Sequence, residues 1–462
     1  MLFTSIQWLV FLAIVFVGYH CLPTRARQWF MLGASLYFYS SWSAPFLLLI
    51  GGQLLIDWTC GYILARTDDP RQRKLVVTAS VAVNLASLCV FKYLGFITRS
   101  LNAVGMAIPV TEFELPLAIS FYTFESMSYT IDVYRYRIKP VRSPLHLALF
   151  ITWFPHLIAG PIVRPSELIP QFKVRPPITS DRFFSGLNLM VIGYSKKLLF
   201  ADWLARVADP IFARPEQFTS LELLLGVYAY AFQILLDFSA YTDIARGASR
   251  WFAIELPENF NDPYMATSIT DFWRRWHMTL SHWLRDYLYI PLGGNRKGRG
   301  RTYFNLMVTM LLGGLWHGAS WTFVVWGALH GLYLAVERAI RLDSPEDLGS
   351  VHRWVRRIVT FQMVCLAWVF FRSPTFVIAW SLLKGMGRGE FFISSENLFP
   401  MTAGVVLIAM YWLCHPLSDA LRQFRPGPSL TWQAAYSVGL GFFLLMIMVL
   451  GAPSGTFIYF QF

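Results

Sequence analysis

Charged residues are scarce in this chain: Asp, Glu, Lys and Arg make up 14% of its 462 residues, whereas a soluble protein averages about 25%. A soluble fold of this length needs a charged surface around its core, and this composition does not supply one. Hydrophobic residues make up 55% of the chain, and the mean hydropathy is +0.46. Several apolar runs approach 20 residues, the length that spans the roughly 30 Å hydrocarbon core of a bilayer; they include 6–22, 75–94, 221–236 and 435–450. We therefore predict an all-α polytopic membrane protein.

Cysteine is also rare. The chain has five cysteines, most of them inside apolar runs, and no CxxC pair, which argues against a zinc site and a disulfide framework. Common signatures of nucleophile and cofactor sites are missing as well: there is no serine nucleophile elbow, Walker loop, HExxH or dinucleotide fingerprint. We expect no metal and no permanently bound cofactor.

The charges that are present favour one sign, with a net charge of +12. Lys and Arg gather in short loops between apolar runs, which is the positive-inside pattern, and no basic stripe with interleaved aromatics indicates nucleic-acid binding. Basic loops at 25–27, 66–74 and 135–142 alternate along the chain; we assign them to the cytoplasm, which places the amino terminus outside. Basic residues at 422–425 precede the last apolar run, so the tail 451–462 is expected outside too.

We expect a single integral membrane domain over 1–462, with N-terminal helices in 1–250, a catalytic core in 251–340 and C-terminal helices and an external tail in 341–462. About 11–13 membrane helices are expected, including re-entrant segments. Pro155 and the Gly-Pro pair at 160–161 interrupt one apolar run, which predicts a bent or re-entrant segment there. The candidate spans are 5–22, 29–41, 44–65, 75–97, 114–134, 144–162, 183–209, 221–246, 303–318, 320–340, 355–373, 400–418 and 435–452.

The segment 250–301 differs from the rest because it has helical spacing and many tryptophans yet carries too many charges to face lipid. An amphipathic helix on the cytoplasmic interface and a helix buried among others both fit this pattern. The segment ends in a flexible, cationic loop at 293–301, which carries Arg296, Lys297, Arg299 and Arg301.

His317 follows this loop in the motif LGGLWHGASW. It lies 16 residues beyond Arg301, or about 24 Å along a helix, so we expect it deep in the membrane. An ionisable side chain at that depth predicts a functional site. Glycines at 313, 314 and 318 leave room for a substrate or for another helix; the alternative is a glycine packing patch with a hydrogen-bonded histidine.

His277 is the second candidate, because the turn at 291–300 can bring it near His317. Two histidines, one acting as general base and one orienting the base or polarising a carbonyl, suit acyl transfer to a hydroxyl. His282 and His330 are weaker candidates. His156 follows a proline in the interrupted span, and we expect it to help satisfy backbone groups freed there.

Five acids fall within apolar runs, and we interpret them as members of structural ion pairs rather than as catalytic groups: Asp57, Glu125, Asp132, Asp237 and Asp243. For the stretch from Asp237 to Asp243, the expected partners are Arg246, or Arg274 and Arg275.

Two motifs, FWRRWHMTLS at 272–281 and LGGLWHGASW at 312–321, together resemble the core of the membrane-bound O-acyltransferases. FYTFESMSY at 121–129 and FPHLIAGPI at 154–162 are similar to the bacterial branch of that family. The resemblance covers nearly the whole chain. It is strongest to the members that acetylate alginate and cellulose, and the branch also includes the teichoic-acid D-alanylation protein.

The resemblance implies a ring of helices around a central tunnel, with His317 as the catalytic histidine and His277 at the second family position. It implies acetyl-CoA or an acetylated carrier as a cytoplasmic donor, with the acceptor approaching from the other side. The basic loop 293–301 would then dock the donor's phosphates, although positive-inside topology explains its charges equally well. The implied setting is a bacterial inner membrane, and the implied partners are exopolysaccharide synthesis machinery and a periplasmic SGNH, esterase-like acetyltransferase.

The tail FIYFQF at 457–462 resembles the C-terminal motif of a small peptide that accompanies the D-alanylation protein, in which a tyrosine relays the acyl group. The resemblance predicts that Tyr459 carries the acyl group here. The alternative is that the tail is an aromatic interfacial anchor.

Two other functions remain open at this stage. Intramembrane acids and interrupted helices also suit a transporter, but transporters usually show two related halves and this chain shows none. A family enzyme with another acyl group or acceptor, such as D-alanine on teichoic acid or a lipid hydroxyl, is the second alternative. The sequence does not identify the polymer.

Overall fold

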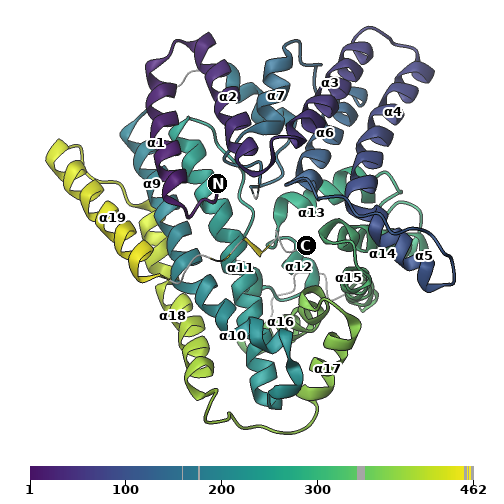
Figure 1. Cartoon of the computed structure of the whole chain (residues 1–462), viewed down its shortest axis with the longest axis vertical. Helices are drawn as coiled ribbons and strands as arrows, with labels where there is room; N and C mark the ends of the chain where they lie inside the picture. The colour runs from purple at the N-terminus through teal and green to yellow at the C-terminus, as the bar shows by residue number, and fades with distance from the viewer. Residues whose placement is uncertain (159, 175–176, 341–348, 452–454, 456, 459–462) are drawn as a thin grey trace. The chain divides into compact units, whose positions relative to one another are not determined.

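The computed structural model describes all residues of the chain except 159, 175–176, 341–348, 452–454, 456 and 459–462 (Figure 1). Every regular element in the described residues is helical, which confirms the predicted all-α fold. The chain divides into two compact units, Met1–Met190 with Thr242–Pro257, and Val191–Tyr241 with Glu258–Phe462.

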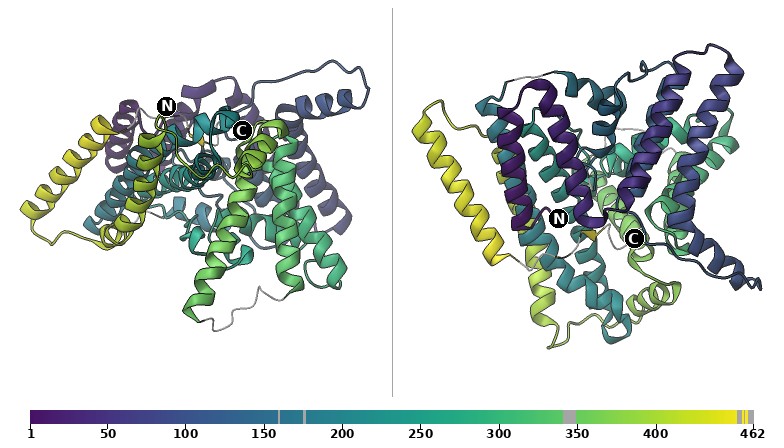
Figure 2. Two further views of the ribbon diagram at one scale, coloured as in Figure 1. Left: turned by 90° about the horizontal axis from the view of Figure 1, so that it is seen from below. Right: turned by 45° about the horizontal axis from the view of Figure 1, so that its top comes forward.

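The first unit holds the N-terminal helices and several short 3-10 or π turns, which carry the label η. Its elements are α1 (Ile6–Cys21), α2 (Thr24–Ser43), α3 (Phe46–Leu64), α4 (Pro70–Leu88), η1 (Cys89–Tyr93), α5 (Leu94–Ala103), α6 (Ile119–Tyr134), α7 (Pro144–Thr152), α8 (Pro165–Leu168), η2 (Ile169–Lys173) and most of α9 (Ser180–Ser195). The π turn η1 joins α4 to α5 without a break, and α5 continues at an angle to α4 (Figure 2).

The second unit holds the two histidine motifs and the C-terminal helices. Its elements are η3 (Lys196–Ala201), α10 (Asp202–Ala213), η4 (Pro215–Gln217), the first part of α11 (Ser220–Trp251), η5 (Pro263–Met265), α12 (Ile269–Trp273), α13 (Met278–Leu284), η6 (Arg285–Tyr289), α14 (Arg299–His317), α15 (Trp321–Ala339), α16 (Ser350–Arg372), α17 (Phe376–Met386), α18 (Leu398–Gln423) and α19 (Leu430–Leu450). α14 packs on α15, and α15 packs on α16 (Figure 2).

Six of the described helices are long and apolar enough to cross a membrane: α3, α4 continued through α5, α11, α16, α18 and α19. The apolar helices α1 and α17 are shorter. In α11, 83% of the most apolar stretch is buried within the protein, against 11% in α18 and 6% in α19. α11 is therefore a core helix, whereas α18 and α19 present their side chains to the surroundings.

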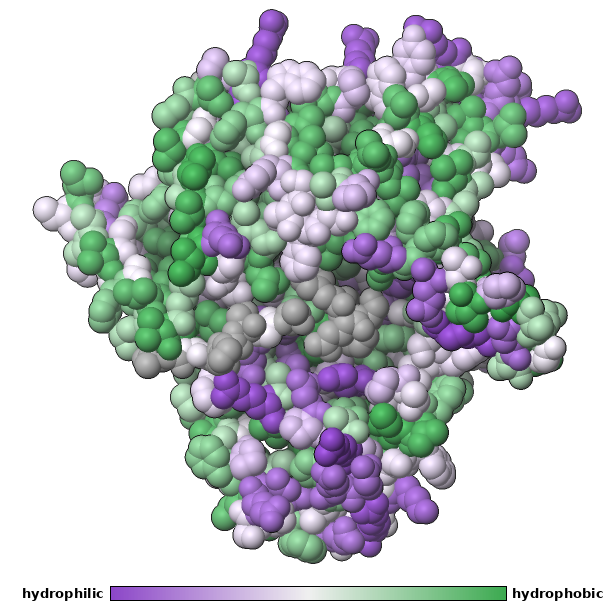
Figure 3. Space-filling view, viewed as in Figure 1, coloured by the Kyte–Doolittle hydropathy of each residue, from purple (hydrophilic) through white to green (hydrophobic). Residues whose placement is uncertain are grey.

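The surface of α19 shows what those surroundings are. Leu430, Val438, Phe442, Leu445 and Val449 are each more than half exposed, and hydrophobic residues cover this helix in the space-filling view (Figure 3). Large apolar side chains exposed along a whole helix fit contact with lipid rather than with water. The chain is a multi-pass membrane protein.

The interrupted span of the first unit is bent, as predicted. α7 ends at Thr152, and residues 153–158 form turns rather than a helix. The carboxylate of Glu125 accepts a hydrogen bond from the backbone N–H of Val163 at 3.1 Å, and Nε2 of His156 lies 3.1 Å from the same carboxylate. The predicted role of His156 is therefore indirect, because Glu125 satisfies the freed backbone group and His156 contacts Glu125.

The segment 250–301 does not form one helix, although its spacing is helical. It breaks into α12, α13 and η6, and the break between α12 and α13 falls at His277, whose φ of 41° and ψ of 53° are left-handed. Helical spacing of the tryptophans reports which side chains share a face, but it does not report a single residue that leaves the helical region.

Glycines in the second histidine motif bring two helices together. A Cβ on Gly314 would collide with the backbone carbonyl oxygen of Phe323, and a Cβ on Gly327 would collide with that of Met310. α14 and α15 therefore approach each other at these two glycines. For Gly314, the packing alternative is the correct one.

Candidate functional site

The two predicted histidines lie together in the second unit. His317 is the last residue of α14, and His277 lies between α12 and α13. Their ring centroids are 6.4 Å apart with the ring planes at 47°, and the two residues are only 3% and 0% exposed. The predicted proximity of His277 and His317 is confirmed.

Both short helices beside His277 are held at their N-termini by side chains from elsewhere in the unit. Glu337 of α15 accepts hydrogen bonds from the backbone N–H groups of Ile269 and Thr270 at the start of α12. At the start of α13, Oδ1 of Asn259 accepts from the backbone N–H of Thr279 at 3.2 Å and from its hydroxyl at 3.0 Å. These bonds satisfy backbone N–H groups of the first helical turn, which have no partner within the helix.

The backbone at His277 is strained because this residue has a positive φ. Outside glycine, a left-handed residue costs about 1–2 kcal/mol, and such residues persist only where the surroundings fix them. Here the backbone carbonyl of Asn259 accepts from the N–H of Met278 at 3.0 Å, directly after the left-handed residue. The strain fits a side chain that is held in one position, and strained residues cluster at functional sites.

Aromatic rings enclose both imidazoles. The His317 ring stands edge-on to Trp326 at 5.0 Å and to Phe371 at 5.2 Å. The His277 ring lies 4.8 Å from Phe238 and 6.0 Å from Trp316. A charged imidazolium is unfavourable among buried apolar rings. The neutral form is the one that acts as a general base or donates one N–H to a carbonyl oxygen.

A third imidazole, that of His330, is separated from His317 by the ring of Trp326. His330 of α15 is 0% exposed, and Trp326 lies between it and His317, with ring centroids at 4.9 and 5.0 Å. Within the described part of the chain, neither ring nitrogen of His330 has a hydrogen-bond partner. The sequence ranked His330 low because its surroundings resemble helix packing; its burial beside the pair becomes visible only in the fold. His282, by contrast, is exposed.

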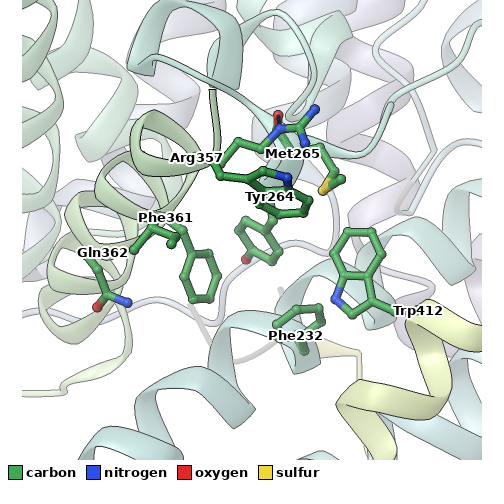
Figure 4. A pocket seen from close by; sticks show the side chains of 9 residues that line it. Phe232, Tyr264, Met265, Arg357, Phe361, Gln362 and Trp412 are labelled. Carbon is green, nitrogen blue, oxygen red and sulfur yellow. Dashed lines mark hydrogen bonds between the residues drawn. The ribbon is translucent and has the colours of Figure 1, made fainter. Parts of the chain in front are cut away.

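An aromatic cavity lies in the same unit and has Tyr264 in its wall (Figure 4). It has a volume of about 520 Å³ and lies among α11, η5, α16 and α18. Its lining residues are Phe232, Tyr264, Met265, Trp354, Arg357, Ile358, Phe361, Gln362 and Trp412. Sequence reasoning missed this cavity because its walls come from four separate elements.

Tyr264 separates the cavity from the residue next to His277. Its ring stacks at 6.2 Å on Trp276, the neighbour of His277 in the chain. The Tyr264 hydroxyl donates to the carbonyl oxygen of Ala231 at 2.6 Å and accepts from Nε1 of Trp368 at 3.2 Å. Tyr264 therefore lies between the cavity and the ring of Trp276.

The four basic residues predicted to dock a donor are all exposed. Arg296 and Lys297 lie in the loop before α14, and Arg299 and Arg301 lie in its first turn. The side-chain amide of Asn305 donates to the carbonyl oxygen of Gly294 at 3.0 Å and holds this loop against the helix. Arg299 and His317 mark the two ends of α14, about 27 Å apart along the axis, so the basic residues are not part of the histidine site.

Asp237 and Asp243 both lie next to a cation, as expected of structural ion pairs, but the cation next to Asp237 is not one of the predicted partners. Asp243 lies 3.8 Å from Arg246, as predicted. Asp237 does not pair with Arg246, Arg274 or Arg275; its carboxylate lies 2.8 Å from Nζ of Lys197. The sequence analysis missed Lys197 because it comes from a different helix, 40 residues earlier in the chain.

Asp57 and Tyr459 are two other residues that the sequence singled out. Asp57 is held by neutral groups rather than by a cation: it accepts from the Ser80 hydroxyl at 2.6 Å, the Asn84 amide at 3.1 Å and the Thr130 hydroxyl at 3.2 Å. Tyr459 lies outside the described residues, so its predicted role as an acyl carrier stays a prediction.

A protein family and several relatives match this sequence. The sequence model of the membrane-bound O-acyltransferase family matches residues 128–380, which include His277 and His317. The chain is 40% identical to the probable alginate O-acetylase AlgI of Pseudomonas putida, over the full length of both proteins.

Two further relatives have other activities. The chain is 36% identical to the peptidoglycan O-acetyltransferase of Helicobacter pylori, over 81% of this chain and 77% of the relative. It is 28% identical to the teichoic acid D-alanyltransferase of Bacillus subtilis, over 56% of this chain and 69% of the relative. Identity and coverage are both lower for the D-alanyl relative than for the two O-acetylating ones.

Proposed function

Because the chain belongs to the membrane-bound O-acyltransferase family, and is therefore an O-acyltransferase, we propose that it acetylates hydroxyl groups of an exported polysaccharide. Its similarity to an alginate O-acetylase spans both chains in full, and a second relative, the peptidoglycan O-acetyltransferase, also acts on a cell-envelope glycan. D-alanine transfer is the weaker candidate because that relative is both more distant and less completely covered.

The observation that carries the proposal is the buried histidine pair. A centroid separation of 6.4 Å brings the two rings close enough to act together on one small group, such as an acetyl carbonyl or an attacking hydroxyl. It also allows a nitrogen of each ring to reach that group at hydrogen-bond distance. Catalytic residues separated in sequence but converging on one buried point are the arrangement that acyl transfer requires.

In the proposed step, neutral His317 takes the proton from the attacking hydroxyl, whose oxygen forms a bond to the acetyl carbonyl carbon. His277 donates an N–H hydrogen bond to the carbonyl oxygen as negative charge develops there. The bond from the carbonyl carbon to the donor sulfur then breaks, and the leaving thiolate recovers the proton from His317. An acetyl ester and a free thiol result, with no other reactant.

We assign acetyl-CoA as the cytoplasmic donor, and Arg296, Lys297, Arg299 and Arg301 as the surface that attracts its phosphates. Their shared exposure at one end of α14 supports this assignment. Exposed cations raise the local concentration of an anionic ligand without needing to touch the reacting atoms.

On the far side, Tyr459 is proposed to receive the acetyl group and to pass it to a periplasmic SGNH, esterase-like acetyltransferase that completes transfer to the polysaccharide. A phenol with a pKa of about 10 is a better leaving group than a sugar hydroxyl, so its ester forms from a thioester and is readily passed on. We also assign the protein to a bacterial inner membrane, with both termini in the periplasm.

Deletion of the gene in the native bacterium, followed by complementation, tests the function. We expect deletion to remove acetyl esters from the exported polysaccharide, measured as acetate released by mild alkali, and wild-type protein to restore them. D-alanine released from the envelope should not change. Unchanged acetate, or a loss of D-alanine instead, would contradict the proposal.

A further inference from the structure

A lysine and two aspartates form a buried cluster in the second unit. Nζ of Lys197 lies 2.8 Å from a carboxylate oxygen of Asp202 and 2.8 Å from one of Asp237. The three residues are 1%, 7% and 3% exposed, so the cluster is shielded from water. One cation against two carboxylates leaves an excess negative charge that needs further donors.

The C-terminal segment supplies those donors from its backbone. The N–H of Ile458 donates to Oδ2 of Asp237 at 2.9 Å, and the N–H of Gly455 donates to the carboxylate of Asp202. Each aspartate therefore lies between Lys197 and one backbone N–H, and the two N–H groups are three residues apart. Hydrogen bonds to an ionised carboxylate are roughly twice as strong as neutral ones.

Side chains of the same segment are buried next to the cluster. Phe457 is 0% exposed and Ile458 is 1% exposed. The Phe457 ring lies 4.2 Å from Tyr241 and 5.7 Å from Phe238. Phe238 in turn lies 4.8 Å from the His277 ring, so a single side chain separates Phe457 from the histidine pair.

We propose that Lys197, Asp202 and Asp237 form a docking site for the chain's own C-terminal segment. The two carboxylates bind the N–H groups of Gly455 and Ile458, Lys197 sets the spacing between the carboxylates, and Tyr241 and Phe238 receive the ring of Phe457. The site positions this segment one aromatic layer from His277.

The energetics favour docking over a purely structural role for the cluster. A buried ion pair is often no more stabilising than apolar residues of the same volume, so stability alone does not explain two carboxylates around one lysine. The second carboxylate has a role when the tail is bound, because each of the two tail N–H groups then donates to a charged acceptor. The proposal rests on the proposed function only in that the docked segment directly precedes Tyr459 in the sequence.

Hydrogen exchange of the tail amides, measured by mass spectrometry on the full chain in detergent, tests the docking site. In the wild-type protein, the amides of Gly455 and Ile458 should exchange on the order of 10-fold or more slowly than expected for an unstructured peptide, since a charge-assisted hydrogen bond must open first. Exchange at the unstructured rate would overturn the proposal without any variant.

Two variants then assign the protection to the cluster. Asp237→Leu and Asp202→Leu each leave Lys197 with one carboxylate, so the remaining pair is neutral. We expect each to raise exchange at its own tail amide on the order of 10-fold. Asp209→Leu is the control, because Asp209 lies on the same helix as Asp202 and pairs with Arg372 at 2.8 Å; tail exchange should then match the wild type. If either cluster variant folds and its tail amides keep wild-type protection, the cluster does not hold the tail.

The docking site and the acyl relay fail in different ways. Tyr459→Phe removes the proposed carrier oxygen and leaves Gly455 and Ile458 in place. Unchanged acetylation by Tyr459→Phe, with the tail still protected, refutes the relay and keeps the docking site. Unprotected tail amides in a fully active wild-type protein refute the docking site and leave the proposed activity standing.

Discussion

At the residue scale, the site depends on two imidazoles held in different ways. His317 ends a regular helix, whereas His277 takes a left-handed conformation between two short ones. The difference suits their proposed roles, because a polarising donor must point at one place in the transition state. The enclosing rings exclude water, which strengthens hydrogen bonds inside the site.

His277→Ala should lower acetylation by about 10-fold to 100-fold, a smaller loss than removal of the base, since a polarising donor stabilises only part of the developing charge. The measurement is polymer-bound acetate at matched membrane levels of the two proteins. A variant that fails to insert, or that elutes as an aggregate in detergent, would show instead that His277 has a structural role.

The sequence identified both histidines because their motifs are local and resemble a known family. It ranked His330 low and did not identify Asn259 or Lys197 as neighbours of the site. Asn259 and Lys197 each act through a partner that is distant in sequence and is brought near only by the fold: Thr279 for Asn259 and Asp237 for Lys197. Periodicity carries no record of such contacts.

At the element scale, the break between α12 and α13 is the feature that spacing did not predict. The side chain of Asn259 caps the start of α13. A substitution removes this side-chain contact and leaves the backbone contact of residue 259 with Met278. Asn259→Ala should destabilise the protein by about 1 kcal/mol and reduce acetylation as His277 loses its support. Asn259→Asp keeps the acceptor oxygen and should recover most of both properties. Thermal unfolding in detergent and polymer acetate are the two readouts; equal behaviour of the alanine and aspartate variants would argue against the cap.

The pair of helices α14 and α15 gives a second test. Gly314→Ala should destabilise the protein, because the added methyl group meets the carbonyl oxygen of Phe323 across the helix pair. Gly439→Ala in α19 is the matched control: nothing lies within 4 Å of its Cβ, and alanine favours a helix by about 1 kcal/mol over glycine. Comparable melting temperatures for the two variants would mean that α14 and α15 tolerate a wider spacing.

At the scale of the whole molecule, apolar runs and scarce charge predicted an all-α membrane protein correctly. The interrupted span near Pro155 was also predicted. The helix α17 was missed, since its 11 residues are too short to form a spanning run. In the segment 250–301, Trp276 and Trp283 are buried within the protein, which favours the buried alternative over an interfacial helix.

The orientation of the whole chain in the membrane can be tested by labelling. Both termini should lie outside, with the 293–301 loop in the cytoplasm, because basic loops alternate along the chain. In a variant without native cysteines, an impermeant thiol reagent added to intact cells should modify Leu2→Cys and not Arg299→Cys. Permeabilised cells supply the control, in which both positions react. Labelling of position 299 but not of position 2 in intact cells would reverse the assignment.

The central claim is that His317 is the base of an O-acetyltransferase, and one substitution tests it most directly. His317→Ala should reduce polymer-bound acetate on the order of 10²–10⁴-fold, at a membrane level equal to that of the wild type. His282→Ala, which removes an exposed imidazole from α13, should acetylate at the wild-type rate. A well-expressed, membrane-inserted His317→Ala protein that sustains near-normal acetylation would contradict the assignment.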